Sequence, residues 1–350
     1  MKKKKIAIIF GGCSTEYDVS LQSAYAVINH INKEQYETIL IGITRQGQWY
    51  RYSGSIENIK DNIWQADPSC VPAMISPNRE DHGIVEVHDN KIVKIPIDAA
   101  FPVMHGKNGE DGTLQGLIEM AGIPLVGCDT LSSAICMDKD VAHKLVNLAG
   151  VNVPKSYVFH IDDSITDIIT KSQTLQYPLF VKPMKSGSSI GITKVDNPDN
   201  LVVAVKDAAL YDDTIIIEEN IEGFEVGCAV LGNNEFVVGE VDEIELSNGF
   251  FDYTEKYTLK SSYIHMPARI DAETANKVKK TAITIYKALK CKGFARVDMF
   301  LTPTGEIVFN EVNTIPGFTS HSRYPNMLKG IGMSFEDILD RLLTLTLQNE

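Results

Sequence analysis

Residues 295–313, ARVDMFLTPTGEIVFNEVN, decide the fold of the C-terminal part of the chain. Two arms in which apolar and polar side chains alternate flank TPTG, where Pro followed by Gly signals a turn. We therefore predict a β-hairpin in which Thr302 pairs with Gly305. The second arm ends in polar residues and continues directly into TIPGFTSHSRYP, residues 314–325. Polar groups at the end of an apolar strand beside a glycine loop favour a functional site.

The predicted register places four polar side chains on one face of the hairpin. Arg296 would face Glu311, and Asp298 would lie diagonally from Glu311, within about 8 Å. Asn313 would point to the same side because side chains alternate along a strand. Carboxylate and amide oxygens suit magnesium better than zinc. The plainer alternative is a polar sheet face with one Arg–Glu cross-strand pair.

The N-terminal part alternates between apolar strands, glycine loops and helices. Residues 6–10 form a strand, GGCSTEYDVS a loop, and the apolar side chains that follow recur at helical spacing. Residues 99–127 repeat the pattern, with His105 at the end of their first strand. This alternation predicts a parallel α/β domain over residues 1–128. The two glycine loops should lie side by side at the carboxyl ends of the strands, where such sheets bind ligands.

Two α+β units follow this domain, a central one over residues 129–219 and a C-terminal one over residues 220–350. The central unit begins with a helix over 132–149, which Gly150 ends. No elements are predicted for residues 51–95. The strands of the two units are predicted from apolar runs at residues 156–159, 178–183, 191–195, 214–219, 224–232 and 236–245.

Composition narrows the class of protein and of partner. The 350-residue chain has a net charge of −13 and a sequence pI near 5.1, which argues against nonspecific binding to nucleic acid or anionic lipid. Six scattered cysteines form no CxxC pair, so neither disulfides nor zinc are expected. The basic N-terminus precedes too short an apolar run for an export signal, and no window reaches the ~18 apolar residues of a membrane span. We expect a protein of the reducing cytoplasm.

Two lysines and one glycine loop are weaker signals. Lys182 ends an apolar strand, and the small residues 184–189 after it could fold over phosphates, although a plain surface hairpin is the commoner outcome. Lys139, between two aspartates on a helix, is ordinarily a solvated surface residue. FGG at residues 10–12 departs from GxGxxG, and no acidic residue ends the next strand, which disfavours a dinucleotide dehydrogenase.

Seven segments in a fixed order resemble the D-alanine:D-alanine ligase family of ATP-grasp enzymes. They are GGCSTEYDVS, HGKNGEDGTLQG, MDKD, VKPMKSGSSIG, IIIEENIEGFEV, ARVDMF and NEVNTIPGFT, and the resemblance covers residues 6–345. It implies an ATP-grasp fold with an N-terminal parallel α/β domain, so the expected fold class is α/β and α+β. It also implies an ATP-dependent ligase of small-molecule substrates that forms a homodimer.

The resemblance implies a set of ATP and metal contacts. Lys139 and Lys182 would contact the phosphates of ATP. Glu218 and Ile221 would hold the adenine, and Glu225 would contact the ribose. Two magnesium ions, which manganese could replace, would be bound by Asp298, Glu311 and Asn313.

The first substrate implied by the resemblance is D-alanine. Its ammonium would bind Glu16, with His105 nearby. Ser188 and Tyr257 would join Glu16 in a hydrogen-bonded triad that closes a lid over the site. The polar segment 247–262 is the candidate lid, and a lid is needed because water would hydrolyse an activated carboxyl group.

The implied reaction is acyl transfer through an acyl phosphate. ATP would phosphorylate the first carboxylate, and the amine of the second substrate would then attack. Arg296 and the backbone N–H of Gly317 would stabilise the oxyanion, because its donors must already be in place. Ser322 and Lys256 would bind the carboxylate of the second substrate.

Departures from the D-alanine pattern point to a particular second substrate. Arg323 follows GFTSHS, where ordinary ligases usually carry Met or Leu, and in this respect the chain resembles the vancomycin-resistance ligases. Lys256 and Tyr257 are retained, unlike in the D-lactate members, and Phe251 stands where D-alanine enzymes usually show Tyr. With Asp242, this set resembles the D-alanine:D-serine ligases of the VanG type. Arg323 held by Asp242 could hydrogen-bond the serine hydroxyl, although Arg323 could also simply pair with an acidic residue at the surface.

Three alternatives stay open at this point. A housekeeping D-alanine:D-alanine ligase differs only in the second substrate, and so does a D-alanine:D-lactate ligase. A nucleotide-binding regulator without chemistry belongs to a different class. The intact set Arg296, Asp298, Glu311 and Asn313 argues against that regulator. The favoured interpretation, a D-serine ligase, implies altered peptidoglycan precursors and vancomycin resistance.

Overall fold

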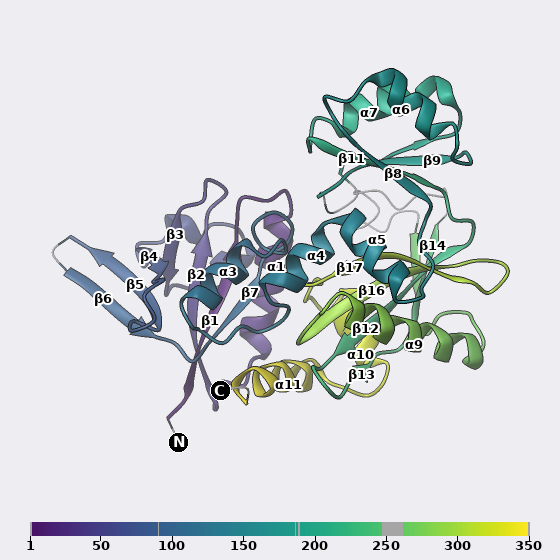
Figure 1. Ribbon diagram of the computed structural model, residues 1–350. Helices are drawn as coiled ribbons and strands as arrows, with labels where there is room; N and C mark the ends of the chain where they lie inside the picture. Colours follow the sequence, from purple (N-terminus) through teal and green to yellow (C-terminus); the bar gives the residue numbers. More distant parts are fainter. Residues whose placement is uncertain (1, 90, 186, 188–189, 247–261, 349–350) are drawn as a thin grey trace.

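The computed structural model describes residues 2–89, 91–185, 187, 190–246 and 262–348. Its strands form three sheets, which follow one another along the chain (Figure 1). The N-terminal and C-terminal sheets belong to neighbouring halves of the body, and the central sheet stands above the C-terminal one in the view of Figure 1. Within these described ranges, no helix is both long and apolar enough to cross a membrane.

The N-terminal sheet has the strand order β6-β5-β4-β3-β2-β1-β7. β1 pairs in parallel with β2 and β7, whereas β3 to β6 pair antiparallel, so the predicted parallel arrangement holds for one end of the sheet only. The antiparallel end comes largely from residues 51–95, for which no elements were predicted. The elements are β1 Lys4–Gly11, α1 Tyr17–His30, β2 Tyr36–Ile43, β3 Trp49–Tyr52, α2 Ile56–Lys60, η1 Trp64–Ala66, β4 Val71–Ile75, β5 Gly83–His88, β6 Lys91–Pro96, β7 Ala99–Val103 and α3 Thr113–Met120.

Helix α1 packs against this sheet through one continuous stripe. Leu21, Ala24 and Val27 recur at the spacing of one helical face and are buried. Ser20 and Ser23 are also fully buried, and both hydroxyls bond to groups outside the helix. The helix therefore brings polar groups, as well as apolar ones, to the inside of the protein.

The central sheet is antiparallel, with the strand order β10-β9-β11-β8. Helices α6 and α7 cover the face turned away from the rest of the molecule (Figure 1). Together with the sheet they enclose a separate apolar core that includes Ile168, Val205 and Ile215. The elements are β8 Ser156–His160, α6 Ile165–Ser172, β9 Leu179–Pro183, β10 Thr193–Val195, η2 Pro198–Asn200, α7 Leu201–Ala208 and β11 Thr214–Glu219.

The predicted helix over 132–149 consists of two helices, α4 (Thr130–Met137) and α5 (Lys139–Leu148). Asp138 separates them because its extended backbone ends α4, while its carboxylate accepts the Val141 N–H at 3.1 Å and caps α5. Lys139 is consequently the first residue of a helix, directed toward the central sheet.

The C-terminal sheet has the strand order β15-β14-β12-β16-β17, with β13 on β12 outside this path. The segment 236–245 is two strands instead of the predicted one, because Glu240 leaves the ladder and its N–H bonds to the Met327 carbonyl at 2.8 Å. The elements are β12 Phe224–Leu231, β13 Val237–Val238, β14 Asp242–Leu246, β15 Ser262–His265, α9 Ala272–Ala288, β16 Phe294–Leu301, β17 Ile307–Asn313, α10 Arg323–Lys329 and α11 Phe335–Leu347.

The hairpin β16–β17 forms as predicted, but its register differs. Thr302 N–H bonds to the Glu306 carbonyl at 3.0 Å, so the loop is one residue longer than predicted and Gly305 takes a φ of 77°. A β-bulge between Asp298 and Met299 adds a second residue on β17. Arg296 consequently faces Asn313 instead of Glu311.

The same shift places Asp298 directly opposite Glu311, where a diagonal position was predicted. Opposite residues of an antiparallel pair point to the same side of the sheet. The four predicted side chains therefore share one face, with different neighbours from those expected.

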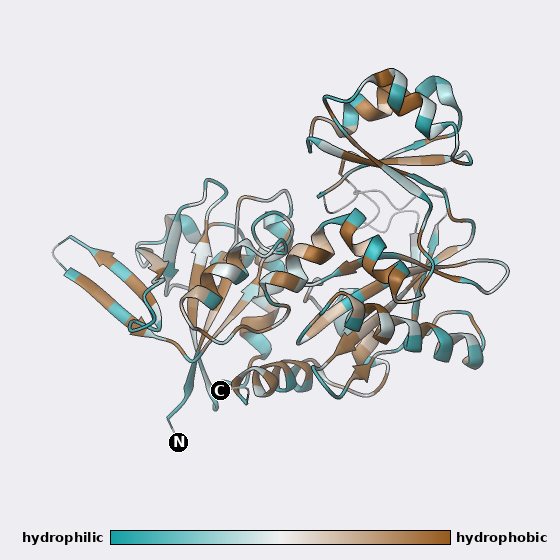
Figure 2. Ribbon diagram, viewed as in Figure 1, coloured by the Kyte–Doolittle hydropathy of each residue, from teal (hydrophilic) through white to brown (hydrophobic). Residues whose placement is uncertain are grey.

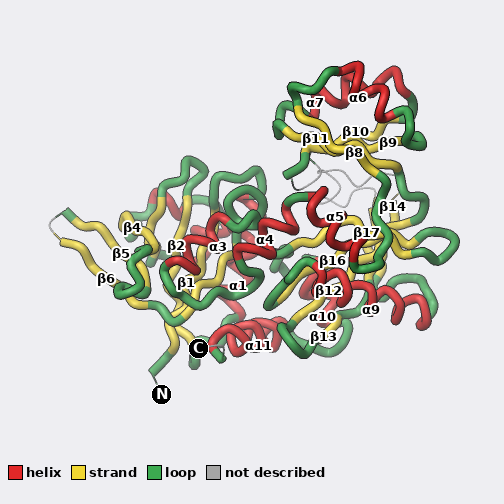
Figure 3. The backbone as a smooth tube through the Cα atoms, in the orientation of Figure 1, coloured by secondary structure: helices red, strands yellow, loops and turns green. Residues whose placement is uncertain are grey.

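Aromatic rings join the N-terminal and C-terminal parts. Phe101 of β7 meets Phe294 of β16 and Phe318, in each case with ring centroids 6.2 Å apart and planes nearly perpendicular. Phe318 and Tyr324 complete the contact from the chain after β17. Figure 2 shows the same organisation, with hydrophobic strands at the centres of the units and hydrophilic residues along outer helices and loops. The tube in Figure 3 shows helices α4 and α5 between the N-terminal sheet and the other two sheets.

Candidate active site

A small cavity lies where the three parts of the chain meet. Its volume is about 50 Å³, and the residues around it come from the β1 loop, the β7 loop, the start of α5 and the end of β17. Four of the predicted site residues line it: Glu16, Lys139, Glu311 and Asn313. The sequence signals that lay far apart along the chain thus converge here.

The carboxylate of Glu16 is surrounded by glycines. A Cβ atom at Gly106 would lie 2.6 Å from Glu16 Oε2, and one at Gly187 would lie 3.2 Å away. The first contact confirms that the two N-terminal glycine loops are neighbours. The second brings Glu16 to the loop that follows β9, next to predicted residue Ser188, which lies outside the described residues.

The polar face of the hairpin is tightly connected. Arg296 donates from Nε and Nη2 to the Asp298 carboxylate at 2.7–3.0 Å, and Asn313 Nδ2 donates to the same carboxylate at 2.9 Å. Asp298 is 1% exposed, and its charge raises the pKa of the Arg296 guanidinium against the opposing effect of burial. The guanidinium is therefore charged and fixed in direction.

The donor set on this face fits magnesium. Asp298, Glu311 and Asn313 offer carboxylate and amide oxygens, which are the hard ligands that magnesium takes in proteins. Only two of the three are acidic, and the part of the chain with described coordinates contains no group of three or more His, Cys, Asp or Glu suited to a metal. The fit therefore depends on Asn313 and on further ligands from a nucleotide.

Arg323, the first residue of α10, occupies the centre of a buried charged cluster. Its Nε and Nη2 donate to Asp242 at 2.7 and 2.8 Å, and Nη1 donates to Glu225 at 2.9 Å. Nη1 also lies 3.3 Å from Asp298 Oδ1. These carboxylates raise the pKa of the guanidinium despite its burial. The sequence hypothesis that Asp242 holds Arg323 is thus met by the geometry.

Gly227 makes room for this arginine. A Cβ atom at Gly227 would lie 2.2 Å from Arg323 Nη2 and 2.6 Å from Asp242 Oδ1. The Gly227 N–H also donates to Asp242 Oδ1 at 3.0 Å. Any side chain at this position of β12 would displace the guanidinium, so the glycine is part of the cluster.

Four of the five predicted nucleotide residues come from α5, the central sheet and the connection after it, whereas Glu225 lies on β12 and bonds to Arg323. Lys182 pairs with Glu218 within the central sheet, and their side chains are only 11% and 4% exposed. Lys139 Nζ donates to the Met184 carbonyl at 3.2 Å, which links α5 to the loop after β9. Ile221 follows in the connection between β11 and β12, and is partly buried.

One acceptor in this group fits a nucleotide base. Glu218 Oε2 is buried and has no hydrogen-bond donor among the residues with described coordinates. A buried carboxylate oxygen without a donor is costly, and the exocyclic amine of adenine is a donor of the kind it lacks. The residues present therefore fit ATP in the predicted position.

Glu110 lines the cavity, and His105 begins the same glycine loop. Burial lowers the pKa of His105, and its Nδ1 lies 2.9 Å from the Ile315 carbonyl oxygen. Burial, together with the charge of Glu16, raises the pKa of Glu110 to about 8. Both groups belong to the glycine loop after β7, and both face the loop after β17.

The loop after β17 contains the two remaining described residues of the predicted set. Ser322 Oγ accepts the Thr319 N–H at 2.9 Å and lies 2.9 Å from the position of a Cβ at Gly317. Gly317 therefore cannot carry a side chain without moving Ser322. The structure brings the proposed oxyanion donor and the proposed carboxylate-binding hydroxyl next to each other.

Four predicted residues cannot be placed. Ser188, Phe251, Lys256 and Tyr257 lie outside the described residues, together with nearly all of the candidate lid. The sequence analysis in turn missed Ser23, Glu110 and Gly227. Glu110 stands in a segment that was quoted for its glycines, HGKNGEDGTLQG, whereas nothing in the local sequence marks Ser23 or Gly227.

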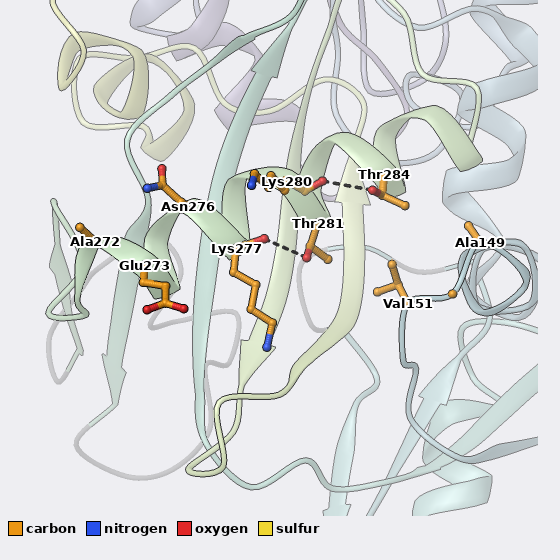
Figure 4. Close-up of a pocket in the computed structure, with 10 residues that line it drawn as sticks. Ala149, Val151, Ala272, Glu273, Asn276, Lys277, Lys280, Thr281 and Thr284 are labelled. Carbon is orange, nitrogen blue, oxygen red and sulfur yellow. Dashed lines mark hydrogen bonds between the residues drawn. The ribbon is translucent and has the colours of Figure 1, made fainter.

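A larger groove lies elsewhere, along α9 and residues 149–151 (Figure 4). Its threonine hydroxyls bond within the helix, from Thr281 to the Lys277 carbonyl and from Thr284 to the Lys280 carbonyl. None of the predicted site residues lines it. The groove is therefore separate from the candidate active site.

Comparisons with known proteins agree with this geometry. Residues 5–128 match the family model of the D-ala D-ala ligase N-terminus, and residues 145–344 match that of the D-ala D-ala ligase C-terminus. A crystal structure of the VanG D-Ala:D-Ser ligase from Enterococcus faecalis is 60% identical, with a TM-score of 0.92 over 99% of this chain and 100% of that one. The predicted ATP-grasp fold class is confirmed by this match.

Curated relatives carry several names. The vancomycin/teicoplanin A-type resistance protein VanA from Enterococcus faecium is 45% identical over 99% of this chain and 100% of its own length. A D-alanine–D-alanine ligase from Caldicellulosiruptor bescii is 44% identical over 99% of this chain and 96% of its own. Identity to curated relatives thus hardly distinguishes between second substrates, and the distinction has to come from the site.

Proposed function

This chain belongs to the D-alanine:D-alanine ligase family of ATP-dependent ligases, and on that premise we propose that it joins D-alanine to D-serine. The observation that carries the choice of D-serine is the position of Arg323. Arg323 follows Ser322 in the chain, its guanidinium is buried, and Asp242 fixes it with two hydrogen bonds. A second substrate bound by Ser322 would have its side chain within reach of this group.

The proposed first step phosphorylates D-alanine. Its carboxylate oxygen attacks the γ-phosphorus of ATP, the bond to the bridging oxygen breaks, and ADP leaves with that electron pair. Lys139 and Lys182 would hold the phosphates, while Glu16 would hold the substrate ammonium. Bound magnesium would offset the charge of the phosphates, and Asp298, Glu311 and Asn313 are the residues that would hold it.

The proposed second step forms the peptide bond. The amine of D-serine attacks the acyl carbon, and the tetrahedral oxyanion is stabilised by Arg296 and by the Gly317 N–H. Phosphate then leaves and the nitrogen loses a proton. Because Asp298 holds the Arg296 fork from two donor atoms, the guanidinium needs no reorganisation during this step.

Selection of D-serine over D-alanine would follow from a hydrogen bond between Arg323 and the side-chain hydroxyl of D-serine. Three of the five N–H groups of Arg323 donate to Asp242 and Glu225, and Nη1 also lies 3.3 Å from Asp298 Oδ1, so the second hydrogen of Nη2 is the donor proposed for a ligand. D-alanine cannot use such a donor, and a buried polar group without a partner costs binding energy. The same argument does not favour D-lactate, because its side chain is a methyl group without a hydroxyl.

The test is a competition. Purified protein is incubated with ATP, magnesium and D-alanine, D-serine and D-lactate are added together, and products are quantified by mass spectrometry. We expect mainly D-alanyl-D-serine, and we expect Arg323→Met to lower the ratio of D-serine to D-alanine product by about tenfold or more. An unchanged ratio in the variant would show that Arg323 does not select the substrate.

The other outcomes have definite meanings. Mainly D-alanyl-D-alanine from the wild type would make the chain a housekeeping ligase, and no ligation in any mixture would favour a nucleotide-binding regulator. Removing magnesium with EDTA should abolish product, and magnesium or manganese should restore it. The homodimer, a cytoplasmic location, the lid with Tyr257, and a role in vancomycin resistance belong to the same proposal.

A further inference from the structure

The loop after β17 is tied to the N-terminal domain by a continuous path of hydrogen bonds. Phe318 N–H donates to Ser23 Oγ at 3.2 Å, and Ser23 Oγ lies 3.2 Å from His105 Nε2. His105 Nδ1 lies 2.9 Å from the Ile315 carbonyl oxygen. Ile315 N–H then donates to Glu110 Oε1 at 3.1 Å. The path begins and ends on the segment Ile315–Phe318.

The direction of every bond in this path is determined. A carbonyl oxygen can only accept, so His105 Nδ1 carries the hydrogen. Burial lowers the pKa of His105, so the ring is neutral and Nε2 is an acceptor for the Ser23 hydroxyl. The Ser23 oxygen is then free to accept the Phe318 N–H. No donor in the path faces another donor.

Glu110 closes the path on the N-terminal side. Its second oxygen, Oε2, accepts the Gly106 N–H at 2.8 Å. One carboxyl group thus holds both the glycine loop after β7 and the segment Ile315–Phe318. Ser23 is fully buried and His105 is 4% exposed. Hydrogen bonds of this kind, shielded from water, keep their partners in one geometry.

The segment held in this way contains the proposed oxyanion donor. Both ends, Ile315 and Phe318, have their N–H groups bonded to the N-terminal domain, and Pro316 has none. The Gly317 N–H has no acceptor within the described parts of the chain. The path therefore fixes both neighbours of one N–H group that is left for a ligand.

We propose that Ser23, His105 and Glu110 are positioning residues that fix the segment Ile315–Phe318 and thereby aim the Gly317 N–H at the oxyanion that forms during peptide-bond formation. This inference rests on the proposed function. It assigns a part of the second chemical step to the N-terminal domain, through Glu110, which lines the cavity of the candidate site, and through Ser23, which is not among its lining residues. A purely architectural role would affect both chemical steps equally.

The experiment separates the two steps in Ser23→Ala. Formation of the acyl phosphate is followed by positional isotope exchange in ATP labelled with ¹⁸O at the β,γ-bridge, with D-alanine present. Dipeptide formation is followed by mass spectrometry. We expect dipeptide formation to fall about 10- to 100-fold, below the 10²–10³ loss typical of deleting an oxyanion donor outright, while isotope exchange stays within about threefold.

A second variant and a control guard against misfolding. Glu110→Ala removes both oxygens that accept the Gly106 and Ile315 N–H groups, and should produce the same split. The control is Ser172→Ala on α6, which removes another fully buried serine hydroxyl. This hydroxyl has no hydrogen-bond partner among the described residues, so both chemical steps should stay unchanged. Thermal unfolding of all three variants is recorded alongside.

Two results would overturn the inference. Equal losses in exchange and dipeptide formation would mean that the path is only structural, and no loss in either variant would mean that the segment needs no such support. If the wild-type protein shows neither exchange nor dipeptide, the proposed function itself fails. Failure of the inference and failure of the function are therefore distinguishable.

Discussion

Two groups of buried cations face each other across the candidate site, and they are built differently. In the arginine cluster, Arg296 and Arg323 each hold a carboxylate with two donor atoms. In the lysine cluster, the Lys182 ammonium pairs with a Glu218 oxygen and the Lys139 ammonium donates to the Met184 carbonyl. A guanidinium fork fixes direction, whereas an ammonium supplies a point charge that can turn. The comparison suggests a division of labour for the proposed function, in which the proposed peptide-forming side needs orientation and the proposed nucleotide side needs charge.

The largest expected effect tests whether orientation matters at Arg296. Arg296→Lys keeps the positive charge but cannot hold Asp298 with two donors, so the oxyanion loses a fixed partner. We expect kcat to fall about 100- to 1000-fold. The KM for ATP should change by less than about threefold, and steady-state kinetics measure both values. A loss that appears mainly as a higher KM for ATP would contradict the distinction between the clusters.

The next effect concerns stability on the lysine side. Lys182→Met leaves the buried Glu218 carboxylate unpaired, and we expect the free energy of unfolding to fall by about 3 kcal/mol. Replacing both residues, with Lys182→Met and Glu218→Leu, should restore most of this loss. Urea denaturation followed by circular dichroism measures the difference. If the double variant is no more stable than the single one, the lysine does not act as a simple charge partner.

A smaller effect is expected when the arginine cluster is displaced without removing any of its charges. In Gly227→Ala the new methyl group would lie 2.2 Å from Arg323 Nη2 and must push the guanidinium aside. We expect the ratio of D-serine to D-alanine product to fall about fivefold to tenfold, because the donor for the hydroxyl moves.

The matched control for this change is Gly116→Ala in α3. A Cβ there meets only Thr130, at 3.6 Å, which is ordinary contact distance. The product ratio should not change in this variant. Equal shifts in both variants would indicate a general effect of alanine instead of displacement of Arg323.

The smallest effect is a dependence on pH. Burial and the charge of Arg296 lower the pKa of His105 in the folded state, although Glu16 opposes them. In the unfolded chain a histidine has a pKa of about 6.5, and in the folded protein the pKa of His105 is lower. As pH falls below about 6.5, the unfolded state therefore gains a proton that the folded state does not, and the free energy of unfolding decreases. His105→Gln should therefore lose less stability than the wild type between pH 7.5 and 5.5, by about 1 kcal/mol. Urea denaturation at the two pH values checks the sign, and a greater loss in the variant would contradict it.

The hairpin shows how far sequence can predict a site. The turn was predicted one residue too short, and the bulge on β17 was not predicted at all. Each error alone would have shifted the strand register by one residue and placed the β17 side chains on the opposite face of the sheet. Together they shift it by two residues, which is the period of a strand. The shared face of Arg296, Asp298, Glu311 and Asn313 was therefore predicted correctly from a register that was wrong.

The residues that were missed depend on contacts that no local pattern records. Ser23 lies on the buried side of a helix, where hydroxyls and methyl groups are equally compatible with helical spacing. Gly227 stands inside a regular strand, and its need for hydrogen as a side chain appears only when Arg323 arrives from 96 positions further along the chain. Lys139 and Lys182, in contrast, could be proposed only through family resemblance, because a lone lysine carries little information.

The missing side chain of Gly227 also makes positions 227 and 323 dependent on each other. A methyl group at position 227 would lie 2.2 Å from Arg323 Nη2, so it conflicts with the arginine in its present place. A residue too short to reach this space would not meet that methyl group. The energetic effects of substitutions at the two positions should therefore not add, although 96 residues separate them along the chain.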